Sequence, residues 1–174
     1  MKIHTVLLLS LILLSVLFRQ ASAAETHRLQ TIGEIKARAL EGVAFLTNEQ
    51  LLERASQNSK LVLLDVRTQR EFQAGHLPGA SWVERGIAEF VLARTLVDQT
   101  SEIIVYCKKG FRAALVVKSL RDAGYSNVSA HAGFDAWSSA GHRYANYLGE
   151  SVLVEPSTIN AASFKPDYYQ PKLK

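Results

Sequence analysis

The stretch IIVYCKKGFR at residues 103–112 sets an apolar run directly before a cysteine and a short basic segment that contains Gly110. Four consecutive apolar residues are typical of a strand that is covered on both faces in a parallel sheet. After this segment, apolar residues recur at helical spacing until Gly124, a natural helix end. They are Ala113, Val116, Val117, Leu120 and Ala123. The stretch therefore predicts a buried strand, a turn and an amphipathic helix.

Strand and helix signals alternate on both sides of this unit. The run LVLL at residues 61–64 repeats the buried-strand pattern, and Thr47 with Gln50 has the spacing of a helix capping box. Strands joined by helices imply right-handed crossovers and a parallel sheet. The sequence thus predicts an α/β domain over residues 43–145, with three α/β/α layers and a central, mainly parallel sheet. The other expected elements are strands at residues 43–46 and 128–130 and helices at residues 47–58, 69–74, 84–97 and 134–139.

Composition limits the classes of protein to consider. The chain has 174 residues, of which 48% are hydrophobic and 21% charged, as in an ordinary globular domain and unlike a disordered chain. The formal net charge is +4, and removal of Lys2 and Arg19 with the first 23 residues would lower it to +2. So small a surplus does not indicate a nucleic-acid partner.

The first 23 residues have the pattern of a secretory signal peptide. Lys2 precedes an apolar run at residues 6–18, and Ala21-Ser22-Ala23 forms a site of the small-x-small type. We expect cleavage after Ala23 and a periplasmic or secreted protein. The alternative is a membrane anchor, but as a helix this run would rise only ~20 Å, short of the ~30 Å hydrocarbon core. No stable membrane anchor is therefore expected.

Two further segments flank the predicted domain. Residues 24–42 are expected to form a helical extension, with an amphipathic helix over residues 29–40 that packs on the domain. Residues 146–174 contain three prolines and several aromatic residues, and we expect an irregular C-terminal arm whose aromatic side chains dock on the body of the protein.

Cys107 is the only cysteine, so no disulfide can form within the chain. It lies where a parallel strand ends and the next helix begins, a place where ligands bind and helix amides are unpaired. Lys108, Lys109 and Arg112 add positive charge, and Gly110 allows successive amides to point inward as an anion-binding nest. These features favour the thiolate form. Cys107 is thus a candidate nucleophile, and we expect its sulfur to be reachable from solvent; the alternative is an inert buried side chain.

Four ordered motifs resemble those of the single-domain rhodaneses, the thiosulfate sulfurtransferase family. They are LLDVR at residues 63–67, Glu71-Phe72 followed by GHLPGA at residues 75–80, VYCKKGFR at residues 105–112, and AGFDAW at residues 132–137. The resemblance covers about residues 43–141 and implies a rhodanese-like fold. It does not extend to residues 24–42 or to the C-terminal arm.

The resemblance implies a persulfide mechanism. The Cys107 thiolate would attack the outer sulfur of a small anionic donor such as thiosulfate, and cyanide or a thiol acceptor would then remove that sulfur. Two lysines after the cysteine resemble the loop of thiosulfate-using members, whereas Phe111 is larger than the residue often found there. No cofactor is implied. The residues implied to bind substrate are Lys108, Lys109, Gly110, Phe111 and Arg112.

Other residues receive lesser roles. Asp65 and Arg67 resemble the family's supporting residues, which link loops near the site. His76 belongs to a turn motif, so a structural role is favoured over general base catalysis, and nothing promotes His131. His27 and His142 show no metal-ligand spacing, and no metal site is proposed.

Three alternative functions, from other classes of protein, stay open. A rhodanese-like module could bind sulfur or an anion, or act as a sensor, without turnover. A cysteine phosphatase is less favoured. The cysteine loop of the related phosphatases has five residues between cysteine and arginine, whereas here four residues separate Cys107 from Arg112. A thiol-disulfide oxidoreductase lacks its resolving cysteine, since that position is Gly110.

Overall fold

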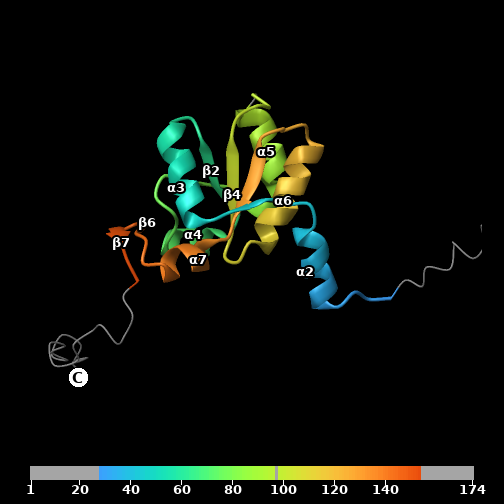
Figure 1. Cartoon of the computed structure of the whole chain (residues 1–174), viewed down its shortest axis with the longest axis horizontal. Coiled ribbons are helices and arrows are strands. Elements are labelled where there is room, and N and C mark those ends of the chain that lie inside the picture. Colours follow the sequence, from blue (N-terminus) through green and yellow to red (C-terminus); the bar gives the residue numbers. More distant parts are fainter. Residues whose placement is uncertain (1–27, 97, 154–174) are drawn as a thin grey trace, which may run out of the picture. The chain divides into compact units, whose positions relative to one another are not determined.

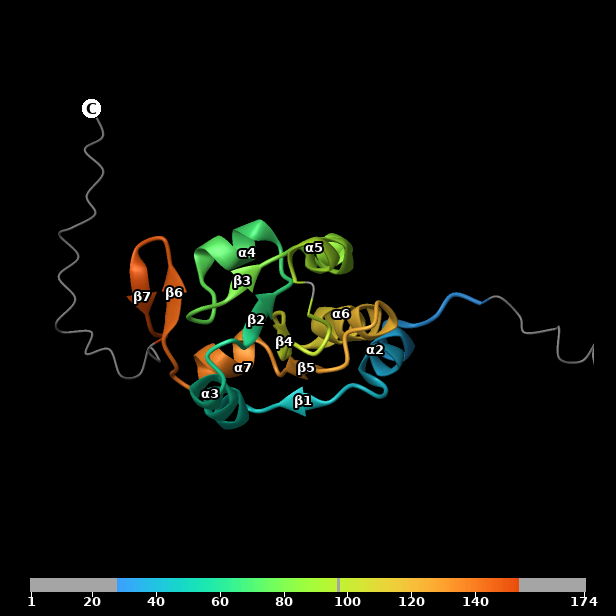
Figure 2. The same cartoon turned by 90° about the horizontal axis from the view of Figure 1, so that it is seen from above.

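Five parallel strands form the central sheet of the domain. The computed structural model describes residues 28–96 and 98–153, and the domain lies within Lys36–Lys174, one of two units into which the chain divides. The sheet has the order β1-β5-β4-β2-β3 (Figures 1 and 2). Its strands are β1 (Phe45–Leu46), β2 (Val62–Asp65), β3 (Ser81–Trp82), β4 (Ile103–Tyr106) and β5 (Val128–His131).

Helices cover both faces of this sheet. Seen from above, α5 and α6 lie on one face and α3 and α7 on the other (Figure 2). The predicted three-layer α/β/α fold with a mainly parallel sheet is confirmed. The helices are α2 (Ile32–Leu40), α3 (Asn48–Gln57), α4 (Gln69–Ala74), the 3-10 turn η1 (Arg85–Ile87), α5 (Ala88–Thr95), α6 (Phe111–Asp122) and α7 (Phe134–Ser139).

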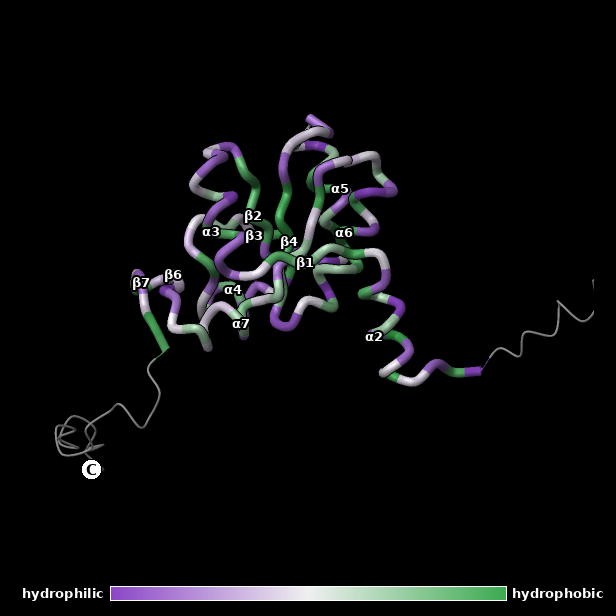
Figure 3. Tube along the Cα trace, in the orientation of Figure 1, coloured by the Kyte–Doolittle hydropathy of each residue, from purple (hydrophilic) through white to green (hydrophobic). Residues whose placement is uncertain are grey.

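Strand β4 is the central element of the core. All four of its residues are buried, and hydrophobic positions concentrate along the inner strands in Figure 3. Successive side chains of a strand point to opposite faces. Ile103 and Val105 accordingly pack in one cluster with residues of α5 and α6, whereas Ile104 and Tyr106 pack in a second cluster with Leu51 and Trp137. Each fully buried aliphatic side chain contributes ~1.5–3 kcal/mol, so this strand anchors both layers.

Local signals explain where the helices begin. Thr47 and Gln50 form the predicted capping box of α3, and Thr68 with Glu71 forms a second one at α4. The helix expected at residues 84–97 is instead divided between η1 and α5. Ile87 has φ −133° and ψ 7°, outside the helical range, so the α-helix begins only at Ala88.

The start of the predicted C-terminal arm is regular, which corrects the expectation of an irregular segment from residue 146. Strands β6 (Tyr144–Asn146) and β7 (Gly149–Ser151) form an antiparallel hairpin, and Ala145 bridges to His76. The side chain of Asn146 accepts a hydrogen bond from the Leu148 amide at 2.8 Å, which stabilises the two-residue turn. The prolines of the arm, at positions 156, 166 and 171, lie outside the described residues.

The helix expected at residues 29–40 forms from Ile32 to Leu40. Within the domain, Ala39 of this helix is buried and Lys118 donates a hydrogen bond to the Arg38 carbonyl at 2.5 Å. The predicted signal peptide lies outside the described residues. In the part of the chain that the structure covers, no helix is both long and apolar enough to cross a membrane.

His131, the last residue of β5, is fully buried and links two helices to the sheet. Its Nδ1 accepts a hydrogen bond from the Gly133 amide at 3.2 Å. Nε2 therefore carries the proton and donates to Oδ1 of Asn48 at 2.9 Å. Burial, with a smaller contribution from His142, lowers the pKa of His131 to about 4. The imidazole is thus a neutral structural element at physiological pH.

Acidification should destabilise the protein through His131. The unfolded state binds a proton near pH 6.5 and the folded state only near pH 4, so this stabilisation is present above pH 6.5 and is lost as the pH falls toward 4. Between pH 7 and pH 5 the wild type should lose about 2 kcal/mol more than His131→Gln. Urea unfolding of both proteins at the two pH values measures this, and equal losses would contradict it.

Candidate active site

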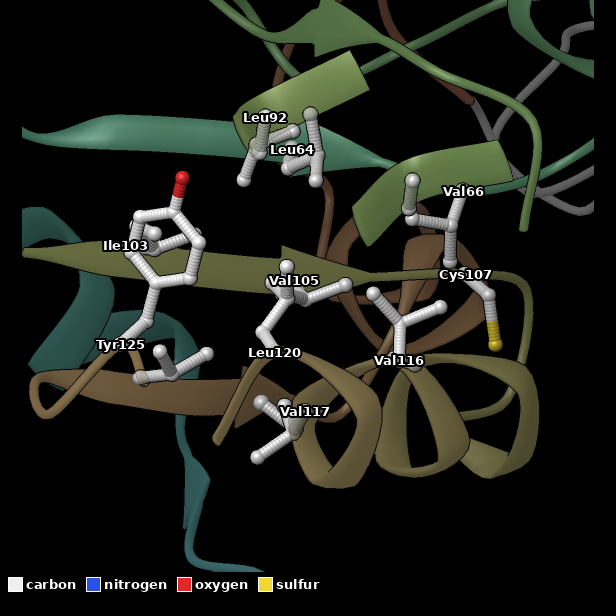
Figure 4. Close-up of a cluster of buried hydrophobic side chains, with 14 residues drawn as sticks. Leu64, Val66, Leu92, Ile103, Val105, Cys107, Val116, Val117, Leu120 and Tyr125 are labelled. Carbon is white, nitrogen blue, oxygen red and sulfur yellow. The ribbon is translucent and has the colours of Figure 1, made fainter. Parts of the chain in front are cut away.

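Cys107 follows the central strand directly and belongs to the cluster formed by β4, α5 and α6. It continues the alternation of Ile103 and Val105, so its side chain faces the same layer. Figure 4 shows its sulfur at the edge of this cluster, beyond Val66 and Val116, on the side where the chain turns from β4 into α6. The residue is 2% exposed, which corrects the expectation of a solvent-reachable sulfur. The strand alternation turns the side chain toward this layer, and the packing of α6 against the sheet buries it.

Gly110 gives the turn after Cys107 its shape. Its φ of 84° lies in the left-handed region that favours glycine, and it caps α6 without a side-chain hydrogen bond. A Cβ at this position would also lie 2.7 Å from Cε1 of Phe45. Both the backbone conformation and the neighbouring ring therefore require glycine here.

The first turn of α7 holds this loop in place. The amide of Phe134 donates to the Cys107 carbonyl at 2.8 Å, and the amide of Asp135 donates to the Lys108 carbonyl at 3.1 Å. Gly133, with φ 113°, permits the approach, because a Cβ there would lie 2.5 Å from the Lys108 oxygen. In a planar trans peptide the N–H points away from the C=O. The amides of Lys108 and Lys109 are therefore directed to the side opposite α7.

Six consecutive amides beside Cys107, those of residues 108–113, lack a hydrogen-bond partner among the described residues. Within the described residues, those of Lys108, Lys109 and Gly110 have no hydrogen-bond acceptor in the protein. Those of residues 111–113 open α6, where amides lack intrahelical partners, and the helix has no side-chain cap. A row of unpaired amides at a helix start attracts an anion.

The basic side chains around this loop differ in their exposure and in their partners. Lys108 is exposed, and Lys109 lies 3.9 Å from Asp135 in an exposed pair that contributes little. Phe111 is half-buried and lies beneath the ammonium group of Lys36, 5.0 Å from its ring centre. Lys108 and Lys109 therefore remain available to an approaching anion.

Arg112 is fixed by an acid that lies 41 residues away in sequence. Its guanidinium donates to the two carboxylate oxygens of Glu71 at 2.8 and 2.7 Å. This contact lowers the pKa of Glu71 to about 2. The pKa of Arg112 is raised, first by Glu71 and also by the neighbouring Cys107. Arg112 is thus a positioned cation next to the thiol rather than a mobile one.

Asp65 and Arg67 form a buried ion pair at the end of β2. Nη2 of Arg67 lies 2.6 Å from Oδ2 of Asp65 and donates to the Gly75 carbonyl at 2.5 Å. The guanidinium also lies 4.4 Å from the ring centre of Phe134. The pair therefore links β2, the end of α4 and the start of α7, which are elements that surround the candidate site.

His76 lies in the turn that the sequence indicated. It stacks on Phe72 with ring centres 3.8 Å apart, and Nδ1 lies 2.9 Å from the Phe72 carbonyl oxygen. Across residues 28–96 and 98–153, no group of three His, Cys, Asp or Glu side chains could hold a metal ion.

Sequence reasoning missed two residues near the site, Glu71 as the partner of Arg112 and His131 as the support of Gly133. The position of His131 at the carboxyl end of β5, beside β4 in the sheet, is the signal that could have indicated its proximity. No comparable sequence signal pairs Glu71 with Arg112.

Known proteins are similar to this chain over part of its length. The probable adenylyltransferase/sulfurtransferase MoeZ of Mycobacterium tuberculosis is 27% identical over 107 residues, which span 61% of this chain but only 27% of that protein. The thiosulfate sulfurtransferase GlpE of Pseudoalteromonas translucida is 33% identical over 82 residues, or 46% of this chain and 75% of that protein.

A solved structure and a family comparison extend this likeness. A Rhodopseudomonas palustris protein of unknown function, described as a possible tyrosine phosphatase, has a TM-score of 0.55 and 27% identity, covering 67% of this chain and 96% of that chain. Residues 47–140, more than half of the chain, match the rhodanese-like domain. The chain therefore belongs to the rhodanese-like domain family, with sulfurtransferases among its relatives.

Proposed function

We propose that the protein transfers sulfane sulfur through a persulfide on Cys107. The observation that carries this proposal is the row of unpaired amides at residues 108–113 beside the only thiol of the chain. Such donors stabilise a negative charge on sulfur without reorganisation during the reaction. Arg112, held by Glu71, adds a fixed positive charge at the same place.

The proposed cycle has two transfers. The Cys107 thiolate attacks the outer sulfur of thiosulfate, the S–S bond breaks, and sulfite leaves with the bonding electron pair. The acceptor, cyanide or a thiolate, then attacks the outer sulfur of the persulfide, which yields thiocyanate or a new persulfide and restores the Cys107 thiolate. Neither step needs a proton from a side chain, in keeping with a structural His76.

Burial of Cys107 favours a second candidate function, a rhodanese-like module that binds sulfur or an anion without turnover. At 2% exposure the residue is buried, so little of it is open to a donor or an acceptor. A phosphatase is the third candidate, and the spacing of four residues between Cys107 and Arg112 disfavours it.

We further propose that residues 1–23 direct export to the periplasm or outside the cell. Support comes from Lys2, the apolar run at residues 6–18 and the site at Ala23. The N-terminal mass of the protein recovered from the producing cells tests this, with cleavage after Ala23 expected.

Replacement of the cysteine should abolish sulfur transfer. We expect wild-type protein given thiosulfate and cyanide to form thiocyanate, and Cys107→Ala and Cys107→Ser to form none, because the nucleophile is lost. With donor alone, the intact mass of the wild type should rise by one sulfur atom. This gain can be assigned to a single residue, since the chain has one cysteine.

The outcomes separate the three candidates. A bound sulfur atom without thiocyanate, under varied donors and acceptors, would indicate the binding module. Hydrolysis of an aryl phosphate that Cys107→Ser abolishes would indicate the phosphatase.

The two loop lysines should contribute to donor binding. We expect Lys108→Ala and Lys109→Ala each to raise the KM for thiosulfate several-fold and to change kcat less, because an exposed cation binds the ground state and the transition state about equally. Lys60→Ala, an exposed lysine outside the candidate site, is the matched control. An unchanged KM in both loop variants would show that these lysines only face solvent.

A further inference from the structure

Three hydrogen bonds join the start of α3, the end of β5 and the start of α7. Nδ2 of Asn48 donates to the Ala136 carbonyl at 3.1 Å, and Oδ1 of the same side chain accepts from Nε2 of His131 at 2.9 Å. Nδ1 of His131 accepts from the Gly133 amide at 3.2 Å. This network therefore has both of its ends on the backbone of α7 and its N-cap, and it passes through two other elements.

The stretch between Gly133 and Ala136 carries the two amides that hold the cysteine loop. They are the amides of Phe134 and Asp135, which donate to the loop carbonyls at 2.8 and 3.1 Å. Fixing both ends of so short a stretch fixes the direction of the N–H groups within it, because each peptide unit is planar. The network thus sets the position of the carbonyls that α7 holds and, through them, the direction of the loop amides.

The first turn of α7 needs this support. The helix is six residues long, and a helix of that length is not stable by itself. Its N-cap is Gly133, which has no side chain to cap the helix and has more backbone freedom than any other residue type. Trp137 packs α7 against the sheet, whereas Asn48 and His131 orient its first turn.

Asn48 is not explained by the helix that contains it. Thr47 and Gln50 already form the capping box of α3. Asparagine has a lower helix propensity than alanine. The Asn48 side chain is half-buried, and both polar atoms of its amide have hydrogen-bond partners outside α3. The residue therefore serves the network rather than its own helix.

His131 gives the network a single arrangement. The residue is fully buried, and its ring lies edge-on to Trp137 with the ring centres 6.2 Å apart. Solvent therefore does not compete for its hydrogen bonds, which strengthens them. One ring nitrogen accepts and the other donates, so the imidazole cannot turn over without losing both contacts.

We infer that Asn48 and His131 are positioning residues for sulfur transfer, and that they orient the amides of the cysteine loop through α7. The inference rests on the proposed function and adds to it two residues that act through the backbone of a helix. Loop amides stabilise negative charge on Cys107 only while they point toward the sulfur. A loosened first turn of α7 would let the loop turn, and both the thiolate and the persulfide would lose this stabilisation.

Two substitutions release the network at different points. We expect His131→Leu to lower the maximal rate of persulfide formation about tenfold, less than the loss of a whole oxyanion donor, because the loop amides are displaced rather than removed. Asn48→Ala, which leaves the cap of α3 intact, should lower it several-fold. The half-saturating concentration of thiosulfate should change less, since the exposed Lys108 and Lys109 still attract the anion. Intact mass followed over time at several thiosulfate concentrations measures both quantities.

A conservative variant and a matched control complete the set. His131→Asn carries an oxygen that can accept the Gly133 hydrogen bond in place of Nδ1, so it should recover most of the rate that His131→Leu loses. Tyr125→Phe removes the hydrogen bond of a buried tyrosine to the Leu96 carbonyl, at the end of the core cluster away from Cys107 (Figure 4). It should lower the temperature of thermal unfolding and leave the rate unchanged.

The ultraviolet absorbance of the thiolate gives a readout that needs no sulfur donor. The absorbance lost in Cys107→Ser reports a single group, because the chain has one cysteine. At neutral pH we expect a smaller thiolate absorbance in His131→Leu and Asn48→Ala than in the wild type, and the wild-type value in Tyr125→Phe. If His131→Leu does not fold, Asn48→Ala and His131→Asn carry the test.

The outcomes distinguish this inference from the proposed function. If the network variants unfold at a lower temperature, as Tyr125→Phe does, but keep the wild-type rate and thiolate absorbance, the inference is wrong and the proposed function stands. If the wild type forms no persulfide while the network variants lose thiolate absorbance, the proposed function fails and the positioning role stands. No persulfide together with an unchanged absorbance overturns both.

Discussion

Two hydrogen bonds from the first turn of α7 fix the loop on which the candidate site depends. The amides of Phe134 and Asp135 donate hydrogen bonds to the carbonyl oxygens of Cys107 and Lys108. The amides of Lys108 and Lys109 therefore point away from α7. The close approach of two backbones requires Gly133, and His131 in turn holds the Gly133 amide. The site is therefore built by two neighbouring strand ends, β4 and β5, rather than by the cysteine loop alone.

The charges near Cys107 are of two kinds, arginines held by a carboxylate partner and exposed lysines. Arg112 and Arg67 each have a carboxylate partner, which offsets the cost of holding them in partly or fully buried positions. Lys108 and Lys109 are exposed, and this leaves them adaptable. The two arginines are therefore held in place near the sulfur, whereas the two lysines can adjust to an approaching anion.

Local sequence signals predicted well those strands and helices whose formation depends on nearby residues. The apolar runs at residues 61–64 and 103–106, the capping box at Thr47 and the helix at residues 69–74 each depend on residues close in the chain. The site was less predictable, because it depends on distant partners. The contact of Arg112 with Glu71 joins two elements, and the burial of Cys107 depends on how α6 packs. The short, polar strands of the hairpin at residues 144–151 give no apolar periodicity.

The burial of Cys107 also restricts what the chain can do with a second copy of itself. A disulfide requires the Cα atoms of its two cysteines to come within about 7 Å of each other. With 2% of the residue exposed and the surrounding loop tied to α7, two molecules cannot bring these atoms together while both stay folded. A lone thiol built in this way resists covalent dimerisation even under oxidising conditions.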